Sequence, residues 1–471
     1  MTPPPRAIRP LIFCGALLLF LAIFKGDGGY HDLVYYLDDA EGLWLRGDMA
    51  RPEEFEEVEA PDGTVTERPV YSQYALGLAF ISGPFVLAAH ALERLSNGWI
   101  RARPVAVLII PILGALSALL LFEIGRALNV SLRASLWAAI VFILGTPVLT
   151  FVRLFYTETA IVFFLLLAVW AFLKALASPA PFRALTWTLL AGAGLAGAGA
   201  CHYAEGVTVT LLWLVMAGTF AFVAPSQPDH SRVLKVIALS AAPLLAVSSI
   251  LYVNYLRRGH FFDTGYGSDV AEISARNLSY NWRYFFFAVE NKLKLGLLVR
   301  SPWIVLSAAA LVLWKRHDGS HWLRRALLVG ALSQTLFWMS YAMLGFSPIR
   351  YLYPATGALT IGLLCLGHAL EARWHTRGLY ITGALLIVLN LILFIIGDDR
   401  NQTFLYAPDE SHSLLFYTWY MRAFPMGITD GYGTPPGRAQ WMVLIVLTSL
   451  GISCLAHAWR IILKFNLKDT D

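Results

Sequence analysis

Side chains that could act in catalysis are concentrated between residues 26 and 77, directly after the first apolar run of the chain. Four aspartates, Asp27, Asp32, Asp38 and Asp39, lie close together there. Carboxylates beside hydrocarbon are costly unless water, partners or a function accompany them. An ionised aspartate can remove a proton from a hydroxyl group, so this stretch is predicted to hold a general base.

Other polar residues that could bind a substrate stand at the ends of later apolar runs. Each has a simpler explanation when taken alone, because a single glutamate is usually a solvated cap or half of a structural pair. A single arginine usually extends its charge to the interface, and His202 can be a packing residue. Convergence at the same ends of several spans nevertheless favours a common site. The set comprises Arg153, Tyr156, Thr157, Glu158, His202, Tyr203, Glu205, Arg300, Arg350 and Tyr351.

The composition defines the class of protein. Apolar residues make up 57% of the 471 positions and charged residues 14%, with a mean hydropathy of +0.60. Because average soluble chains carry roughly a quarter charged residues, a soluble domain is excluded and an all-α polytopic membrane protein is indicated. The 13% of aromatic residues suits interfacial belts of Trp and Tyr. The net charge of +5 comes mostly from Arg and Lys residues in loops. Such residues set the orientation of a protein in the membrane, so the charge does not indicate a nucleic-acid partner.

The four cysteines are Cys14, Cys201, Cys365 and Cys454, which lie in or at the ends of apolar runs without paired spacing. They therefore give neither a disulfide framework nor a metal-binding signature. The first apolar run resembles a signal peptide in its flanking charges. It lacks a clear small-residue cleavage site and is interpreted as an uncleaved helix.

About twelve spans are expected from the apolar runs that are long enough to cross a bilayer. They cover residues 10–24, 104–124, 134–151, 157–173, 185–200, 206–224, 234–256, 297–314, 326–345, 351–369, 379–396 and 441–461. The run 74–92 can either span or form a re-entrant or interfacial helix. If this run does not span, most basic clusters lie on the same face as both termini. The positive-inside rule identifies that face as cytoplasmic.

Three long polar segments then share the outer face, at about 25–103, 257–296 and 397–440. No separate soluble domain is visible, so residues 1–471 are predicted to form a single integral membrane domain. From Asp32 to Arg46, apolar residues recur at helical spacing and Asp39 lies off that stripe. This pattern predicts a helix resting on the bilayer with its polar side toward water. An amphipathic linker helix with incidental acids is the simpler alternative.

Four sets of residues resemble motifs of the GT-C superfamily of membrane glycosyltransferases, in the style of its bacterial protein O-mannosyltransferase-like branch. The first is Asp32-x-x-Tyr35-Tyr36 followed by Gly47-Asp48. The others are the stretches 71–77, 153–158, and 296–302 with 350–354. The resemblance extends to about residue 370. Ala75 replaces the family's signature proline, and Leu33 stands where many mannosyltransferases have a second acid.

This resemblance implies a polyprenyl-phosphate sugar donor, an inverting transfer and a site facing the periplasm or exterior of a plasma (inner) membrane. Asp32 is the implied general base, with Asp27 as second choice. Glu158 would orient the acceptor or help to bind a divalent metal, although no cofactor is certain. The implied donor phosphate ligands are Arg350, Lys292, Lys294, Arg300 and Tyr351, and the implied substrate contacts are Tyr35, Tyr71, Tyr74, Tyr156, His202 and Glu205.

An anionic lipid-linked donor needs fixed cations, and its acceptor needs a carboxylate. The acidic turn after the first span and the basic corner near Arg350 are therefore expected to share one cavity. The acceptor is a glycan, a lipid or a protein. Two alternatives remain at this point: a transporter or flippase of lipid-linked sugars, and a glycan polymerase or ligase that uses a polyprenyl-diphosphate donor.

Overall fold

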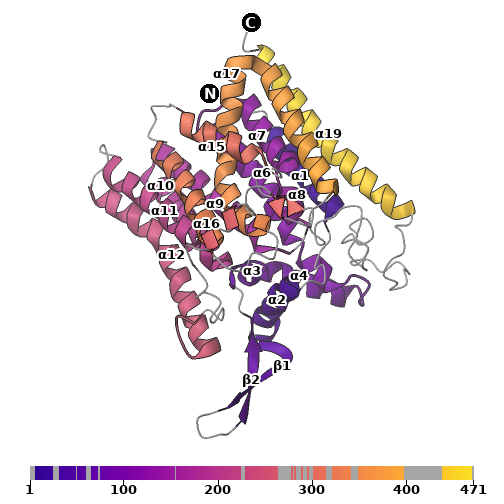
Figure 1. The fold of residues 1–471 in the computed structure, drawn as a ribbon, viewed down its shortest axis with the longest axis vertical. Coiled ribbons are helices and arrows are strands. Elements are labelled where there is room, and N and C mark those ends of the chain that lie inside the picture. Colours follow the sequence, from indigo (N-terminus) through magenta and orange to yellow (C-terminus); the bar gives the residue numbers. More distant parts are fainter. Residues whose placement is uncertain are drawn as a thin grey trace.

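The computed structural model of the chain describes residues 6–24, 31–48, 50–59, 65–72, 75–153, 155–223, 229–263, 277–278, 281–282, 288–289, 294–295, 301–314, 321–340, 348–396 and 438–468. Within these residues the chain is a helical bundle, with both termini at the top of the view in Figure 1. The predicted all-α class is confirmed for this bundle.

The long apolar runs form the helices of the bundle. These are α1 Ile8–Ile23, α5 Ala102–Ala106, α6 Ile109–Ala127, α7 Leu132–Gly145, α9 Thr157–Ala177, α10 Pro181–Cys201, α11 Gly206–Gly218, α12 Asp229–Arg258, α15 Trp303–Leu313, α16 His321–Ser340, α17 Pro348–Ile396 and α19 Arg438–Lys468. Each predicted span overlaps at least one of these helices, although residues 297–300 and 341–345 of two predicted spans lie outside the described residues. Among the described residues, six helices are long and apolar enough to cross a membrane, so the number twelve remains a prediction.

Helix α17 contains two of the predicted spans. Its backbone leaves the helical conformation at His375, where φ is +53°. A positive φ is uncommon for a residue with a side chain, and here it separates the apolar stretches on either side. The predicted turn between the tenth and eleventh spans is therefore observed inside one continuous element.

Contacts of α1 show how the neighbouring helices run. Arg9 donates from Nε to Glu123 Oε1 at 2.8 Å near the end of α6, whereas Phe20 packs against Gly114 near the start of α6. Helices α1 and α6 are therefore antiparallel. Gly114 also lies against Val152, so the end of α1, the start of α6 and the segment before α9 share one level.

Helix α19 also runs against α1. Gly15 packs against Leu455, and Gly451 packs against Leu19. The first and last described residues are therefore at the same end of the bundle, which we call the terminal end. The opposite end, where α1 finishes and α2 (His31–Glu41) follows, is called the α2 end.

The first half of α17 begins at the α2 end. Gly357 packs against Val162 near the start of α9, whereas Glu371 accepts a hydrogen bond from Ser131 at the start of α7. Helix α17 therefore runs parallel to α9 up to its break. The backbone of Arg350 lies at the same end as α2, as the expected shared site requires.

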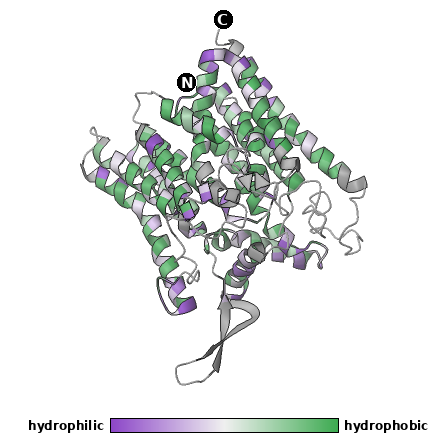
Figure 2. Ribbon diagram, viewed as in Figure 1, coloured by the Kyte–Doolittle hydropathy of each residue, from purple (hydrophilic) through white to green (hydrophobic). Residues whose placement is uncertain are grey.

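Large apolar side chains are exposed on the outer helices. Leu245 on α12 is 69% exposed, and Leu385 on α17 is 64% exposed. Figure 2 shows that hydrophobic residues cover most of the bundle, with hydrophilic residues near the helix ends. This distribution suits contact with lipid along the bundle. The chain is a multi-span membrane protein.

Short elements cover the α2 end. The five-residue turn η1 (Gly42–Arg46) follows α2, and the run 74–92 forms α3 (Gly77–Ile81) and α4 (Gly83–Leu95), separated at Ser82. Trp44 donates from Nε1 to the carbonyl oxygen of Ala79 at 3.1 Å. The ambiguous run is thus two short helices packed beside α2, and its position relative to the membrane remains a prediction.

A β-hairpin that the sequence analysis did not predict lies between η1 and α3. Strands β1 (Ala50–Glu59) and β2 (Val65–Tyr71) pair antiparallel, with Glu57 opposite Glu67. The hairpin projects from the α2 end in Figure 1. A second two-stranded sheet, β3 (Ala288–Val289) with β4 (Lys294–Leu295), lies in the second predicted outer segment.

The contact of α3 with α10 gives a test of this packing. A Cβ atom on Gly77 would lie 2.4 Å from the carbonyl carbon of Ala200, and backbone cannot rotate away as a side chain can. Gly77→Ala should therefore destabilise the protein by about 1–3 kcal/mol and lower its melting temperature in detergent. Gly218→Ala, where no atom lies within 4 Å, is the matched control. Equal melting temperatures for both variants would contradict the observed packing.

Candidate functional site at the α2 end

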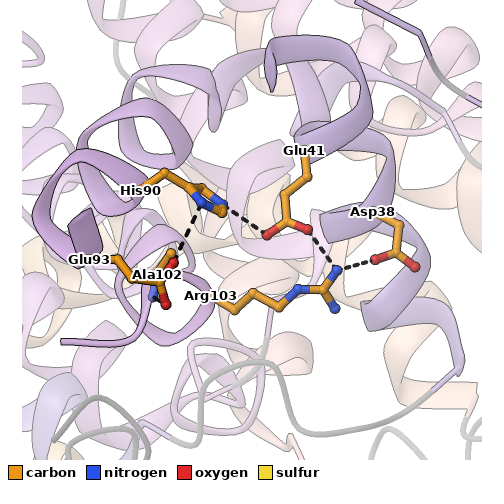
Figure 3. Close-up of polar contacts among 6 residues, drawn as sticks. All are labelled: Asp38, Glu41, His90, Glu93, Ala102 and Arg103. Carbon is orange, nitrogen blue, oxygen red and sulfur yellow. Dashed lines mark hydrogen bonds and ion pairs between the residues drawn. The ribbon is translucent and has the colours of Figure 1, made fainter. Parts of the chain in front are cut away.

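Two carboxylates of α2 form ion pairs with one arginine of α5. Arg103 of α5 donates from Nη2 to Asp38 Oδ1 and to Glu41 Oε2, both at 2.6 Å. Figure 3 shows this fork between α2 and α5. Because an arginine that bridges two carboxylates of one helix fixes its rotation as well as its position, α2 has a defined orientation.

The same network continues into α4 (Figure 3). His90 Nε2 lies 3.2 Å from Glu41 Oε1, and His90 Nδ1 lies 3.7 Å from Glu93 Oε2. Glu93 Oε1 in turn accepts a hydrogen bond from the backbone N–H of Ala102 at 3.2 Å. Helices α2, α4 and α5 are therefore joined by one polar chain at the edge of the bundle.

Asp39 faces in a different direction and is buried. Its Oδ1 lies 3.7 Å from Nη2 of Arg257, at the end of α12, and both side chains are at most 3% exposed. The expectation that Asp39 lies on a water-facing side of α2 is therefore wrong. Asp39 instead faces α12, where Arg257 supplies the positive charge that compensates a buried carboxylate.

Arg257 and Arg258 also hold the connector after the hairpin. The carbonyl oxygen of Ser72 accepts from Arg257 Nη1 at 3.3 Å and from Arg258 Nη2 at 3.0 Å. The end of α12 thus contacts both α2 and the segment that leads into α3. Tyr203 lies near this group, and its burial raises the pKa of its phenol while the two arginines act in the opposite direction.

Two buried glutamates form a second group beside Tyr203. Glu205 ends the short turn η2 (Tyr203–Glu205), and Gln334 of α16 donates to it from Nε2. Glu158 stands at the start of α9, where its Oε2 accepts from the Thr157 hydroxyl at 3.4 Å. Burial, reinforced by the charge of Glu158, raises the pKa of Glu205 to about 8, although the Gln334 hydrogen bond opposes this shift.

Six of the residues that the resemblance implied as catalytic or substrate-binding have described side chains, and the structure places them at the α2 end. Glu158, Tyr156 and Glu205 are buried, and His202 is half-buried near them. Tyr35 and Tyr71 are half-buried on the α2 and hairpin side. The structure therefore brings the predicted acids of α9 and η2 together.

The remaining predicted residues are placed only in part. The backbone of Asp32 lies in α2, that of Lys294 in β4, and those of Arg350 and Tyr351 in α17, without described side chains. Asp27, Tyr74, Lys292 and Arg300 lie outside the described residues. The roles assigned to these residues remain predictions.

Sequence reasoning missed three members of the site: Asp39, Arg257 and Gln334. Arg257 and Arg258 open the predicted outer segment 257–296, and basic residues on the outer face oppose the positive-inside rule, which was itself a signal. Gln334 is a polar residue inside an apolar run, and such residues often have functional roles. The pairing of Asp39 with Arg257 joins positions far apart in the chain and leaves no spacing pattern.

The possible metal role of Glu158 can be examined from its surroundings. Among the residues that the structure describes, no three His, Cys, Asp or Glu side chains are grouped so that they could hold a metal ion. Glu158 contacts Thr157 and lies near Glu205, whose carboxyl favours the protonated form. Within the described part of the chain, Glu158 is therefore not part of such a group, and the mechanism below contains no metal-dependent step.

Comparisons with known proteins relate this arrangement to a family. The sequence model of the dolichyl-phosphate-mannose-protein mannosyltransferase family matches residues 108–261, which include α9, η2 and the end of α12. No curated protein matches the sequence of the chain significantly.

Several solved structures align with the chain, and one of them shares its fold. Apo ArnT from Cupriavidus metallidurans aligns with a TM-score of 0.51 at 13% identity, covering 95% of this chain and 74% of ArnT. The Archaeoglobus fulgidus oligosaccharyltransferase aligns with a TM-score of 0.44 at 15% identity, over 82% of this chain and 52% of that protein. The Saccharomyces cerevisiae Pmt1-Pmt2 complex aligns with a TM-score of 0.40 at 18% identity, covering 54% of this chain and 35% of that chain. The chain thus spans about half the length of the oligosaccharyltransferase.

The structure is a helical membrane bundle with buried charged residues and short helices at one end. About a third of the chain matches the sequence model of the mannosyltransferase family, and the bundle shares its fold with ArnT.

The raised pKa of Glu205 predicts a specific pH dependence of stability. The native state retains a proton on Glu205 up to about pH 8, whereas the unfolded chain releases it near pH 4.3. This contribution to stability is therefore complete below the unfolded value and is lost as pH rises to about 8. Glu205→Gln, which imitates the protonated form, should become increasingly more stable than wild type over that interval. Melting temperatures at several pH values measure this, and a constant difference would contradict it.

Proposed function

We propose that the protein transfers a sugar from a polyprenyl-phosphate-linked donor to an acceptor hydroxyl at the α2 end of the bundle. The observation that carries this proposal is the fixed position of α2, which bears Asp32 and is held by Arg103 and by Arg257. The matched family model names dolichyl-phosphate-mannose, a sugar on a polyprenyl phosphate, as its donor. The acceptor is a glycan, a lipid or a protein.

In the proposed reaction Asp32 removes the proton of the acceptor hydroxyl as the hydroxyl oxygen attacks the anomeric carbon of the sugar. The new bond joins that oxygen to the anomeric carbon, and the bond from the carbon to the phosphate oxygen breaks. Polyprenyl phosphate leaves with the electron pair, and the configuration at the anomeric carbon inverts. Asp27 is the second candidate for the base.

Cations must stabilise the charge that develops on the leaving phosphate. Arg350 is the first candidate, because its backbone begins α17 at the α2 end. Lys292, Lys294, Arg300 and Tyr351 are further proposed ligands.

The buried acids give the acceptor side a distinct character. Glu158 and Glu205 lie close enough to affect each other electrostatically, and the proton favoured on Glu205 makes it a hydrogen-bond donor at neutral pH. Tyr156 and His202 stand beside them in sequence, and Tyr35, Tyr71 and Tyr74 are proposed contacts on the other side. Such groups suit recognition of hydroxyls.

The site is proposed to face the periplasm or exterior of the plasma (inner) membrane. Basic residues gather at the terminal end, including Arg126 at the end of α6 and Lys174 at the end of α9. Positive residues favour the cytoplasmic side. Both termini would then be cytoplasmic and α2 would lie outside.

The test of the function uses purified protein in nanodiscs with a panel of radiolabelled polyprenyl-phosphate sugars, including mannose, glucose and N-acetylglucosamine. Transfer should release free polyprenyl phosphate and label an acceptor in membrane extracts. A flippase would move the labelled lipid without releasing polyprenyl phosphate. A donor preference for diphosphate lipids would instead indicate a polymerase or ligase.

The proposed base gives a second test. Asp32→Asn keeps the size of the side chain and removes the proton acceptor, so the transfer rate should fall by about 10²–10⁴-fold. Asp263→Asn is the matched control, because Asp263 is exposed and its Oδ1 lies 3.9 Å from Nη1 of Arg258. Initial rates at saturating donor provide the measurement. A properly folded Asp32→Asn enzyme with full activity would remove Asp32 from this role.

A further inference from the structure

Arg257 has an unusual set of contacts for a buried arginine. Its Nη1 donates to the Ser72 carbonyl oxygen at 3.3 Å, and its Nη2 lies 3.7 Å from Asp39 Oδ1, beyond hydrogen-bond distance. The side chain is 3% exposed, and its Nε and Nη2 atoms make no hydrogen bond within the described residues. Buried donors without acceptors are rare and costly.

The two unsatisfied atoms belong to the same edge of the guanidinium group. Nε and Nη2 point two parallel N–H bonds outward from that edge, which is the geometry that binds two oxygen atoms at once. Nη1, on the other side, is anchored to backbone. The arginine is therefore fixed in position, with Nη2 of its bidentate edge nearest to Asp39.

The neighbouring carboxylate decides what kind of group suits this edge. A phosphate or carboxylate would accept from Arg257 but would be repelled by Asp39 a few ångströms away. A hydroxyl group can accept from Arg257 and donate to Asp39, and an oxygen at ordinary hydrogen-bond distance from both fits a 3.7 Å gap. Two adjacent hydroxyls, as in a sugar ring, match both N–H bonds.

We propose that Arg257 and Asp39 form a subsite for a pair of neighbouring sugar hydroxyls, a role that rests on the proposed function. Asp32 stands seven residues before Asp39 on α2, which is two helical turns, or about 10 Å along the axis, at the same position around the helix. The subsite and the proposed base thus share one face of one fixed helix. Arg257 acts here as a sugar-binding residue and not as a phosphate ligand.

The test compares two ligands on the full-length protein in nanodiscs. The probes are the polyprenyl-phosphate sugar accepted by wild type, chosen from the mannose, glucose and N-acetylglucosamine donors, and bare undecaprenyl phosphate. Arg257→Lys keeps the charge and removes the bidentate edge. It should weaken binding of the sugar-bearing lipid about tenfold or more, since a hydrogen bond to a charged group is lost, and leave binding of undecaprenyl phosphate within about twofold.

Two further variants complete the design. Arg46→Lys alters an exposed arginine at the same end of the bundle and should change neither affinity. Asp39→Asn keeps the side-chain size and should also selectively weaken the sugar-bearing lipid, which provides a test if Arg257→Lys does not fold. Melting temperatures confirm that each variant is folded.

Other outcomes would overturn the inference. Equal weakening of both lipids would identify an anion site, and unchanged affinities with a lower melting temperature would identify a purely structural pair. The wild-type protein could bind and transfer a sugar while Arg257→Lys and Asp39→Asn bind the sugar-bearing lipid with normal affinity. That result would refute the subsite and leave the proposed function intact. Failure of wild type to bind any sugar-bearing lipid would refute both.

Discussion

The arrangement of the α2 end depends on the contacts of two adjacent aspartates with two arginines. Successive residues of a helix point about 100° apart, so Asp38 and Asp39 reach different partners, Arg103 of α5 and Arg257 of α12. A single contact would allow α2 to rotate about its axis, whereas two contacts in different directions do not. This constraint gives a short amphipathic helix, which would otherwise lie loosely on a membrane, a fixed face toward the bundle.

The same contacts explain how a long outer segment can contribute to a precise site. The hairpin lies between α2 and α3, yet its last connector is held by Arg257 and Arg258 at Ser72, and α3 packs its glycine directly against the backbone of α10. Both ends of the projecting hairpin are therefore anchored to the bundle. Residues on α2 keep their position relative to α9, α10 and α12 whatever the hairpin itself does.

The sequence was sufficient to predict the helices because apolar runs of spanning length have few alternative structures. The sequence also predicted that Glu158 and Glu205 lie at the same end of the bundle, because the basic residues in the loops indicated which span ends share a face. The hairpin was missed although Pro61, Asp62 and Gly63 form a turn signal, because the first strand is rich in glutamate, a residue that is depleted in strands. Asp39 and Arg257 were missed for a different reason, since helical periodicity specifies a face of α2 but not whether lipid, water or another helix covers it.

Buried acids at the α2 end are stabilised in two different ways, and the difference has chemical consequences. Asp39 lies beside a guanidinium group. Glu205 accepts a hydrogen bond from the Gln334 amide and lies near Glu158, so protonation is its favourable state. One acid therefore offers acceptors and the other offers a donor at the same pH. A ligand bearing several hydroxyl groups can use both kinds of partner, whereas a simple anion or cation can use only one. The electrostatics of the bundle end thus suit a polyol more closely than an ion.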